Sequence, residues 1–298
     1  MLVAGATGYI GGQLARALID DGASVRCLVR DLDRAAGLRR DGCELVQGDV
    51  LERDSLEGAL DGIEVAYYLV HSMGRGGDRR GFSERDHRGA ENFAAAAKAA
   101  GVARRVYLGG LGDPGSEHLR SRHDTARALA ASGVPLTYFR AAAVIGAGSE
   151  SFRVVYHLVD RLPAMVTPRW VATRTQPIAV DDVVGYLRAA LDRPDLGGRE
   201  IEIGGPDVTT YGGMMDATAR ALGRRPRPRI PVPLLSPGLS SLWIGLVTPV
   251  DAAVARPLIE GLATETVVRD ASGMESFGLA RTPLDDALRA AVEELRGA

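Results

Sequence analysis

The segment GATGYIGG, residues 5–12, constrains the fold of this chain more than any other feature. It sets Gly5, Gly8 and Gly11 at the spacing G-x-x-G-x-x-G, between a short apolar segment and one whose apolar residues recur every four positions. Glycines at this spacing allow a tight turn, close approach of a pyrophosphate to the backbone, and tight packing of helix on strand. The start of the helix adds free N–H groups and a partial positive charge, which favour phosphates. The segment therefore predicts a dinucleotide-binding unit.

The same alternation of strand and helix continues through the first half of the chain. Apolar segments that predict strands occupy residues 1–5, 24–30, 43–49, 63–71, 104–110 and 136–146. Helical segments lie between them, at residues 9–22, 55–62, 89–100 and 124–131. Such alternation predicts a parallel sheet with helices on both faces. The expected fold class is α/β: a Rossmann-type doubly wound parallel sheet with a small C-terminal substrate cap.

The alternation loosens after Gly148, where segments containing proline begin. We therefore expect residues 1–148 to form the Rossmann core, with residues 178–205 returning to it. Residues 149–177 and 206–298 are expected to form the cap. In an open α/β sheet this cap would lie over the carboxyl ends of the strands, where ligands bind.

Composition limits the function classes. A formal charge of −2 and a pI near 6.2 provide no field that would attract nucleic acid, so no nucleic-acid partner is expected. Cys27 and Cys43 lack metal-ligand spacing, and no His/Asp/Glu cluster predicts a metal. The N-terminus has no basic region followed by a cleavage site, so the expected location is the cytoplasm.

Residues 230–250, IPVPLLSPGLSSLWIGLVTPV, form an uncharged run. Four prolines within it argue against a membrane-spanning helix, because each removes a backbone donor. Its apolar surface would suit the protein core, an interface between two copies of the chain, or the wall of a pocket for an apolar ligand. We expect part of it to line a pocket for a small hydrophobic substrate, and a homodimer is the other expected association.

Several further segments resemble one superfamily. GATGYIGG, QGDVLERDSL, YYLVHSMG, VYLGGLG and PIAVDDVV together resemble the extended and atypical short-chain dehydrogenase/reductases, in particular their NmrA-like, NAD(P)H-binding branch. The resemblance covers nearly the whole chain and implies a set of cofactor-binding residues. Those in the glycine turn are Gly5, Thr7, Gly8, Tyr9, Ile10 and Gly11. The resemblance assigns Asp49 and Val50 to the adenine side, and Leu69, Val70 and His71 to the nicotinamide side.

The end of the second predicted strand bears on the choice of cofactor. An acidic residue there hydrogen-bonds the ribose 2′-hydroxyl of NAD, whereas an arginine pairs with the 2′-phosphate of NADP. The sequence CLVRD offers Arg30 first and Asp31 next. Arg30 aligns best with the discriminating position, so NADP(H) is favoured, while Asp31 keeps NAD(H) open.

Active members of the superfamily usually carry a Y-x-x-x-K pair and a serine after the fifth strand. The only lysine here is Lys98, and none of the eight tyrosines is followed four positions later by Lys or Arg. Alignment places His118 at the tyrosine position and Arg122 at the lysine position. Gly109 and Gly110 fall where the serine is expected. All three usual catalytic roles have therefore changed.

Two function classes follow from these changes. Arg122 would bind the cofactor's ribose, but its pKa makes it a poor proton shuttle. His118 and His71 are candidate acids, because an unperturbed histidine titrates near neutral pH. The favoured hypothesis is an NADPH-dependent reductase of a hydrophobic carbonyl, enone or quinone. The alternative is a non-catalytic NADP(H)-binding redox sensor or assembly factor.

Overall fold

The computed structural model describes residues 1–71, 81–231 and 263–297, and its centre is a seven-stranded sheet. The strand order is β11-β6-β5-β4-β1-β2-β3, and all neighbouring strands run parallel. The strands are β1 (Leu2–Ala4), β2 (Arg26–Val29), β3 (Glu44–Gln47), β4 (Val65–Tyr68), β5 (Arg104–Gly110), β6 (Leu136–Ala141) and β11 (Glu200–Ile203). The predicted doubly wound α/β fold is confirmed.

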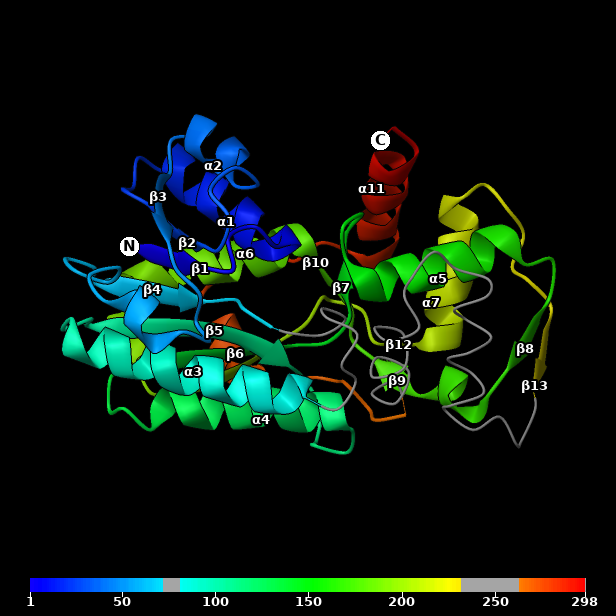
Figure 1. Cartoon of the computed structure of the whole chain (residues 1–298). Helices are drawn as coiled ribbons and strands as arrows, with labels where there is room; N and C mark the ends of the chain where they lie inside the picture. Colours follow the sequence, from blue (N-terminus) through cyan, green and yellow to red (C-terminus); the bar gives the residue numbers. More distant parts are fainter. Residues whose placement is uncertain (72–80, 232–262, 298) are drawn as a thin grey trace.

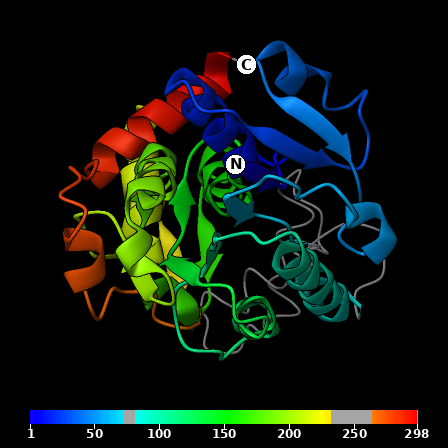
Figure 2. The same cartoon turned by 90° about the vertical axis from the view of Figure 1, so that its left-hand side faces the viewer.

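Helices cover both faces of this sheet (Figures 1 and 2). One face carries α1 (Tyr9–Asp20), α2 (Ala36–Arg40) and α6 (Val180–Ala189). The other carries α3 (Phe82–Ala99) and α4 (Glu117–Ala130), which pack against each other. The chain crosses from one half of the sheet to the other between β3 and β4, so the strand order reverses between β1 and β4. Ligands of such sheets bind at this reversal point.

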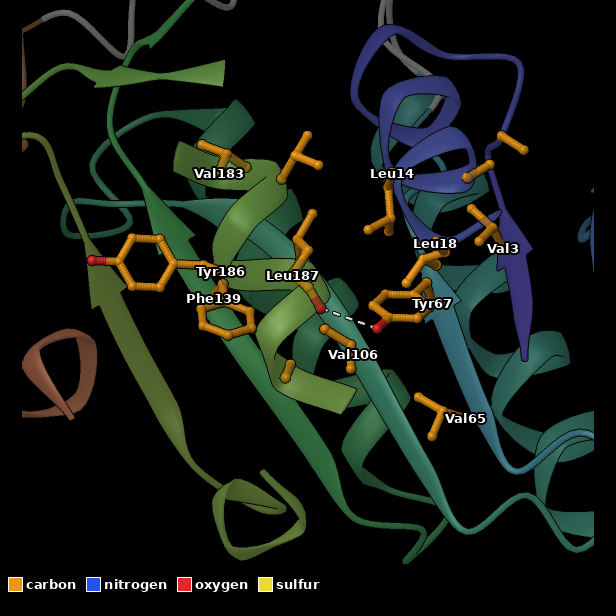
Figure 3. Packing of buried hydrophobic residues seen from close by; sticks show 14 of the residues in the cluster. Val3, Leu14, Leu18, Val65, Tyr67, Val106, Phe139, Val183, Tyr186 and Leu187 are labelled. Atoms are coloured by element: carbon orange, nitrogen blue, oxygen red, sulfur yellow. Dashed lines mark hydrogen bonds between the residues drawn. The ribbon is translucent and has the colours of Figure 1, made fainter. Parts of the chain in front are cut away.

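The apolar layer under α1 and α6 explains why these helices lie side by side. Leu14 and Leu18 of α1 are fully buried, as are Val183 and Leu187 of α6. Figure 3 shows them meeting over the side chains of the central strands. The hydroxyl of Tyr67 donates a hydrogen bond of 3.0 Å to the carbonyl of Leu187, so this buried polar group is satisfied.

The opposite layer is unusually aromatic. Tyr68, Tyr107 and Tyr138 lie on adjacent strands β4, β5 and β6 and are all at most 5% exposed. Tyr107 stacks on Tyr138 with ring centroids 5.2 Å apart, and Tyr68 contacts Phe93 of α3 at 5.0 Å. This layer lies directly beneath α4, the helix in which the usual catalytic pair is absent.

A second group of elements lies beyond the carboxyl ends of the strands (Figure 1). Its own apolar cluster joins α5 (Glu150–Arg161), α7 (Tyr211–Ala221) and α11 (Leu284–Gly297). The remaining elements of this half are short: β7 (Val144–Ile145), β8 (Met165–Thr167), β9 (Arg174–Thr175), β10 (Ile178–Ala179), β12 (Thr209–Thr210), β13 (Arg229–Pro231) and the 3₁₀ turn η2 (Arg169–Ala172). Three further short elements, η3 (Ala190–Asp192), η4 (Pro194–Leu196) and α10 (Ser272–Glu275), pack on the sheet with α6 and β11. The division into domains at the predicted residues stays a prediction.

Three predicted helices differ from the observed ones. Helices α3 and α4 begin seven residues earlier than predicted, at Phe82 and Glu117. The side chain of Ser116 caps α4 by accepting the N–H of Leu119 at 3.2 Å. The helix predicted at 55–62 is wrong, since only the 3₁₀ turn η1 (Arg53–Leu56) forms. Ser55 does not cap a helix there, because its hydroxyl bonds the backbone N–H and carbonyl of Asp49.

Most of the uncharged run at 230–250 lies outside the described residues, except Ile230 and Pro231. The expectation that part of this run lines a pocket therefore concerns residues that are not described. Within the three described ranges, no helix combines the length and apolar character needed to span a membrane.

Candidate functional site

The glycine turn between β1 and α1 has a separate steric requirement at each glycine. Gly5 has a φ of +90°, and a Cβ there would lie 2.6 Å from the carbonyl oxygen of Leu69. A Cβ at Gly11 would lie 2.3 Å from the carbonyl oxygen of Gly5, so the helix is packed directly on the turn. A Cβ at Gly8 would meet only the Gly5 carbonyl, at 3.2 Å, within the described part of the chain. Space therefore opens in front of Gly8, at the exposed start of α1.

No acidic side chain lies in the first turn of α1, and Gly8 caps it without a side-chain hydrogen bond. The partial positive charge of this helix end is thus not neutralised by the helix's own residues. Thr7 and Gly8 are exposed, and Tyr9 and Ile10 are half-buried. The turn offers backbone N–H groups to an anion.

The predicted residues after β3 and β4 lie at the same edge of the sheet as the glycine turn. Leu69 donates its N–H to the carbonyl of Ala4 at 2.9 Å, which carries the end of β4 alongside the turn. Val50 is buried, and its carbonyl accepts a hydrogen bond of 2.9 Å from Asn92 of α3. The Asp49 carboxylate accepts the N–H of Leu51 at 3.0 Å. The structure thus brings these sequence-predicted segments together around the reversal point.

In the loop after β2, the side chain of Asp31 is hydrogen-bonded within the loop, whereas the side chains of Arg30 and Arg34 are not. The carboxylate of Asp31 accepts the backbone N–H groups of Asp33 and Arg34, each at 3.0 Å. This Asx turn uses the carboxylate within its own loop. Arg30 and Arg34 are both exposed. Among the described residues, no side-chain hydrogen bond or ion pair engages either guanidinium. The positive groups of this loop are therefore available to a ligand.

A groove of about 600 Å³ opens on one side of the glycine turn. It runs along α1, between α2 and α11, from the turn to Arg16 and Glu294. Thr7, Gly8 and Arg34 line it, while Asp49 and Leu69 do not. Arg34 was not among the residues predicted from the sequence, although it lies only four residues after Arg30.

Of the two candidate residues of α4, Arg122 contacts the buried tyrosine layer. Arg122 donates a hydrogen bond from Nη1 to the Tyr107 hydroxyl at 3.3 Å. Burial lowers the pKa of Arg122, but the nearby Tyr107 and Asp86 outweigh it and leave the pKa raised. Burial, followed by the positive charge of Arg122, lowers the pKa of His118 to about 3. His118 is therefore a neutral imidazole at pH 7.

At the two positions where a serine is usual, a side chain would lie very close to neighbouring side chains. A Cβ at Gly109 would lie 2.8 Å from both the ring edge and the hydroxyl of Tyr138. A Cβ at Gly110 would lie 2.7 Å from the side chain of Leu119. The aromatic layer thus explains the glycine at 109, and at 110 a larger residue would require Leu119 to move. The side chain of His71 is exposed at the end of β4. Within the described ranges no group of three His, Cys, Asp or Glu residues could hold a metal ion.

The family model for the NmrA-like family matches residues 1–211, which cover the whole glycine turn, the strands β1 to β6 and both candidate histidines. The chain belongs to the NmrA-like family. This confirms the resemblance inferred from the sequence motifs.

Two curated relatives of this NmrA-like protein have different names. Ceramide reductase from Caulobacter vibrioides is 31% identical over 290 residues, which are 93% of this chain and 90% of that protein. Photosystem II assembly factor Ycf39 from Cyanophora paradoxa is 31% identical over 194 residues, or 64% of this chain. That match spans only 58% of the length of Ycf39.

The fold is also found among solved structures. Triphenylmethane reductase from Citrobacter sp., complexed with NADP(H), aligns with a TM-score of 0.76 over 97% of this chain and 99% of that chain. The sequence identity is 18%, so this likeness establishes the common fold.

Proposed function

We propose that this NmrA-like protein binds NADP(H) and is a reductase of a hydrophobic carbonyl, enone or quinone. The observation that supports this most strongly is the glycine turn. Neighbouring backbone atoms occupy the space where a side chain at Gly5 or Gly11 would lie. The space in front of Gly8, at the start of α1, is open. That arrangement suits a pyrophosphate, which needs backbone N–H groups and close approach.

The residues present fit a dinucleotide. In this proposal Gly5, Thr7, Gly8, Tyr9, Ile10 and Gly11 hold the pyrophosphate, Asp49 and Val50 border the adenine, and Leu69, Val70 and His71 border the nicotinamide. The exposed Arg30 pairs with the 2′-phosphate of NADP(H), together with Arg34 of the same loop, which lines the groove. One oxygen of the Asp31 carboxylate, Oδ1, accepts both N–H groups of the Asx turn. The two exposed arginines favour NADP(H) over NAD(H).

When bound, NADPH supplies a hydride, so the protein's tasks are orientation and handling of charge. With a pKa of about 3, His118 is not protonated to the imidazolium at neutral pH, so it is a neutral ring that donates or accepts hydrogen bonds and not an imidazolium acid. Arg122 is engaged with Tyr107 and supports that layer. His71 is the remaining candidate acid, and water is the other source of the proton.

Two observations support a hydrophobic substrate with a reducible carbonyl. A substrate that is already polarised, such as an enone or quinone, does not need a tyrosine acid for hydride transfer. The relative from Caulobacter is named a ceramide reductase, and it aligns over nearly the whole of both chains. A hydrophobic substrate with a reducible carbonyl is therefore the best-supported class.

The alternative function is NADP(H) binding without turnover, as part of a redox sensor or an assembly factor. It is supported by the loss of both the tyrosine and the serine, and by the relative named photosystem II assembly factor. In that case the glycine turn would serve binding alone.

A consumption assay separates the two functions. NADPH would be incubated with the protein and a panel containing a benzoquinone, a cyclic enone and a long-chain ketone. The reductase proposal expects oxidation of NADPH with at least one of them. It also expects His71→Phe to lower turnover more than His118→Phe, with NADPH affinity unchanged in both. NADPH binding with no turnover on any of the three would instead favour the non-catalytic function.

A further inference from the structure

The end of β5 and the loop to α4, residues 109–116, lie at the same edge of the sheet as the predicted nicotinamide side. Tyr68, the last residue of β4, pairs with Tyr107, and β5 continues beside β6 to Gly110. Because Gly109 and Gly110 carry no side chains, this part of the segment offers only backbone groups to a substrate. The geometry of that backbone therefore decides what the loop can do.

The side chain of Arg140, on β6, donates hydrogen bonds to two carbonyls of this segment. Its Nη2 donates to the carbonyl of Gly112 at 2.6 Å, and its Nε donates to the carbonyl of Gly110 at 3.4 Å. Its Nη1 pairs with Glu200 at 2.6 Å and Glu202 at 3.4 Å, and only 12% of the side chain is exposed. All three guanidinium nitrogens are thus hydrogen-bonded, and these bonds together fix the orientation of the side chain.

His123 of α4 contacts the same carbonyl, with Nε2 3.2 Å from the oxygen of Gly112. A carbonyl oxygen accepts only, so this contact requires the proton on Nε2. A trans peptide directs its C=O and its N–H to opposite sides. With the Gly112 carbonyl turned toward Arg140 and His123, the N–H of Asp113 faces away from both. Within the described ranges it has no hydrogen-bond acceptor, and Asp113 itself is exposed.

The two donors also change the character of this peptide. Hydrogen bonds to a carbonyl polarise the peptide group and strengthen the N–H on its other side as a donor. A fixed backbone N–H is the kind of group that stabilises a developing oxyanion without reorganising during the reaction.

We propose that Arg140 is a positioning residue for the reductase site, which fixes the Gly112–Asp113 peptide so that the Asp113 N–H donates to the substrate oxygen. This inference rests on the proposed reductase function. After the substrate has accepted a hydride, its oxygen carries a negative charge, and the N–H holds it until the oxygen takes one proton from water. A peptide would thus replace the missing tyrosine and serine as hydrogen-bond donor.

The test compares Arg140→Met and Arg140→Lys with Arg104→Met. Arg104 is the matched control, because it also donates to two carbonyls, those of Ala190 and Leu191, but at the opposite end of β5. We expect Arg140→Met to lower kcat about tenfold or more, with little change in KM or in the NADPH dissociation constant. Arg140→Lys should recover part of the loss, and Arg104→Met should keep kcat whatever it does to the Tm.

A second measurement does not depend on turnover. The backbone amide signal of Asp113 in an NMR spectrum should shift when 4-nitrophenolate is added to the complex with NADP⁺, since this probe carries its charge on an oxygen. The shift should persist in Arg104→Met and disappear in Arg140→Met. Unchanged kcat in Arg140→Met, or no shift in the unmutated protein, would overturn the assignment. If the unmutated protein oxidises NADPH with none of the three substrates of the consumption assay, the reductase function is contradicted, and the role of Arg140 is contradicted as well.

Discussion

The guanidinium of Arg122 donates a hydrogen bond to the hydroxyl of Tyr107, 3.3 Å away, inside the layer between the sheet and α4. The residue at the position of the usual catalytic lysine is therefore committed to a partner within the protein. Ser121, its neighbour, donates to the buried carboxylate of Asp86 at 3.3 Å, so this face of α4 is anchored to α3 as well.

This relationship gives a prediction for Arg122→Met. The variant leaves the Tyr107 hydroxyl without its donor, so the free energy of unfolding should fall by about 1 to 3 kcal/mol. The NADPH dissociation constant should change by less than about threefold, because the guanidinium faces the tyrosine layer. Urea unfolding and calorimetry would check both, with the exposed Arg120→Met as control. A tenfold loss of NADPH affinity would instead support the predicted contact with the ribose.

The loop after β2 gives a prediction about cofactor preference. NADPH should bind more tightly than NADH, and Arg30→Ala and Arg34→Ala should each reduce that difference by roughly tenfold or more. The reason is that a charge-assisted contact to phosphate contributes about 1.5 to 3 kcal/mol. Calorimetry with both cofactors tests this, and Arg40→Ala, at the exposed end of α2, should leave the preference as it is. Equal affinities in the unmutated protein would contradict the assignment of NADP.

The glycine turn predicts two distinct failures. Gly8→Val should keep a normal Tm and lose NADPH binding, because its side chain enters the open space in front of the helix. Gly11→Ala should lower the Tm even without cofactor, because its Cβ would lie 2.3 Å from the Gly5 carbonyl. Thermal unfolding of the cofactor-free proteins, followed by a binding titration, separates the two. Normal NADPH binding by Gly8→Val would remove the main support for the cofactor site.

The lowered pKa of His118 predicts a dependence of stability on pH. Its pKa is lowered to about 3 by burial and by Arg122, whereas in the unfolded chain it titrates near 6.5. Between these values the unfolded chain binds a proton that the folded chain does not. Stability is thus fully present above about pH 6.5 and is lost as the pH falls toward 3, by at most about 1.4 kcal/mol per unit.

Replacing this histidine should flatten that dependence. Urea unfolding of His118→Gln between pH 4 and 7 should show a smaller slope than the unmutated protein. His87→Gln, which removes a side chain that is 48% exposed, should keep the original slope. Equal slopes in His118→Gln and the unmutated protein would show that His118 is protonated normally in the folded state.

The sequence by itself determined the class of fold and the position of the nucleotide turn. Both depend on local rules: apolar residues recur at the period of a strand or a helix, and glycines mark a turn that other residues cannot form. Gly5 has its positive φ and Gly11 its close backbone contact, as the spacing predicted. The absence of the tyrosine and lysine pair could likewise be read directly from the chain.

Tertiary structure alone decided what the replacement residues do. The sequence placed His118 and Arg122 four residues apart on one helix. Only the packing of that helix gives Arg122 its partner in the layer of Tyr68, Tyr107 and Tyr138 and gives His118 its lowered pKa. These tyrosines come from three strands that are far apart along the chain. Arg140 follows the same rule, since it reaches the carbonyl of Gly112, 28 residues away along the chain. A residue's type sets the chemistry it can perform. Its pKa, and the hydrogen-bond donors and acceptors that it has left for a ligand, depend on burial and on partners that only the packing of distant segments provides.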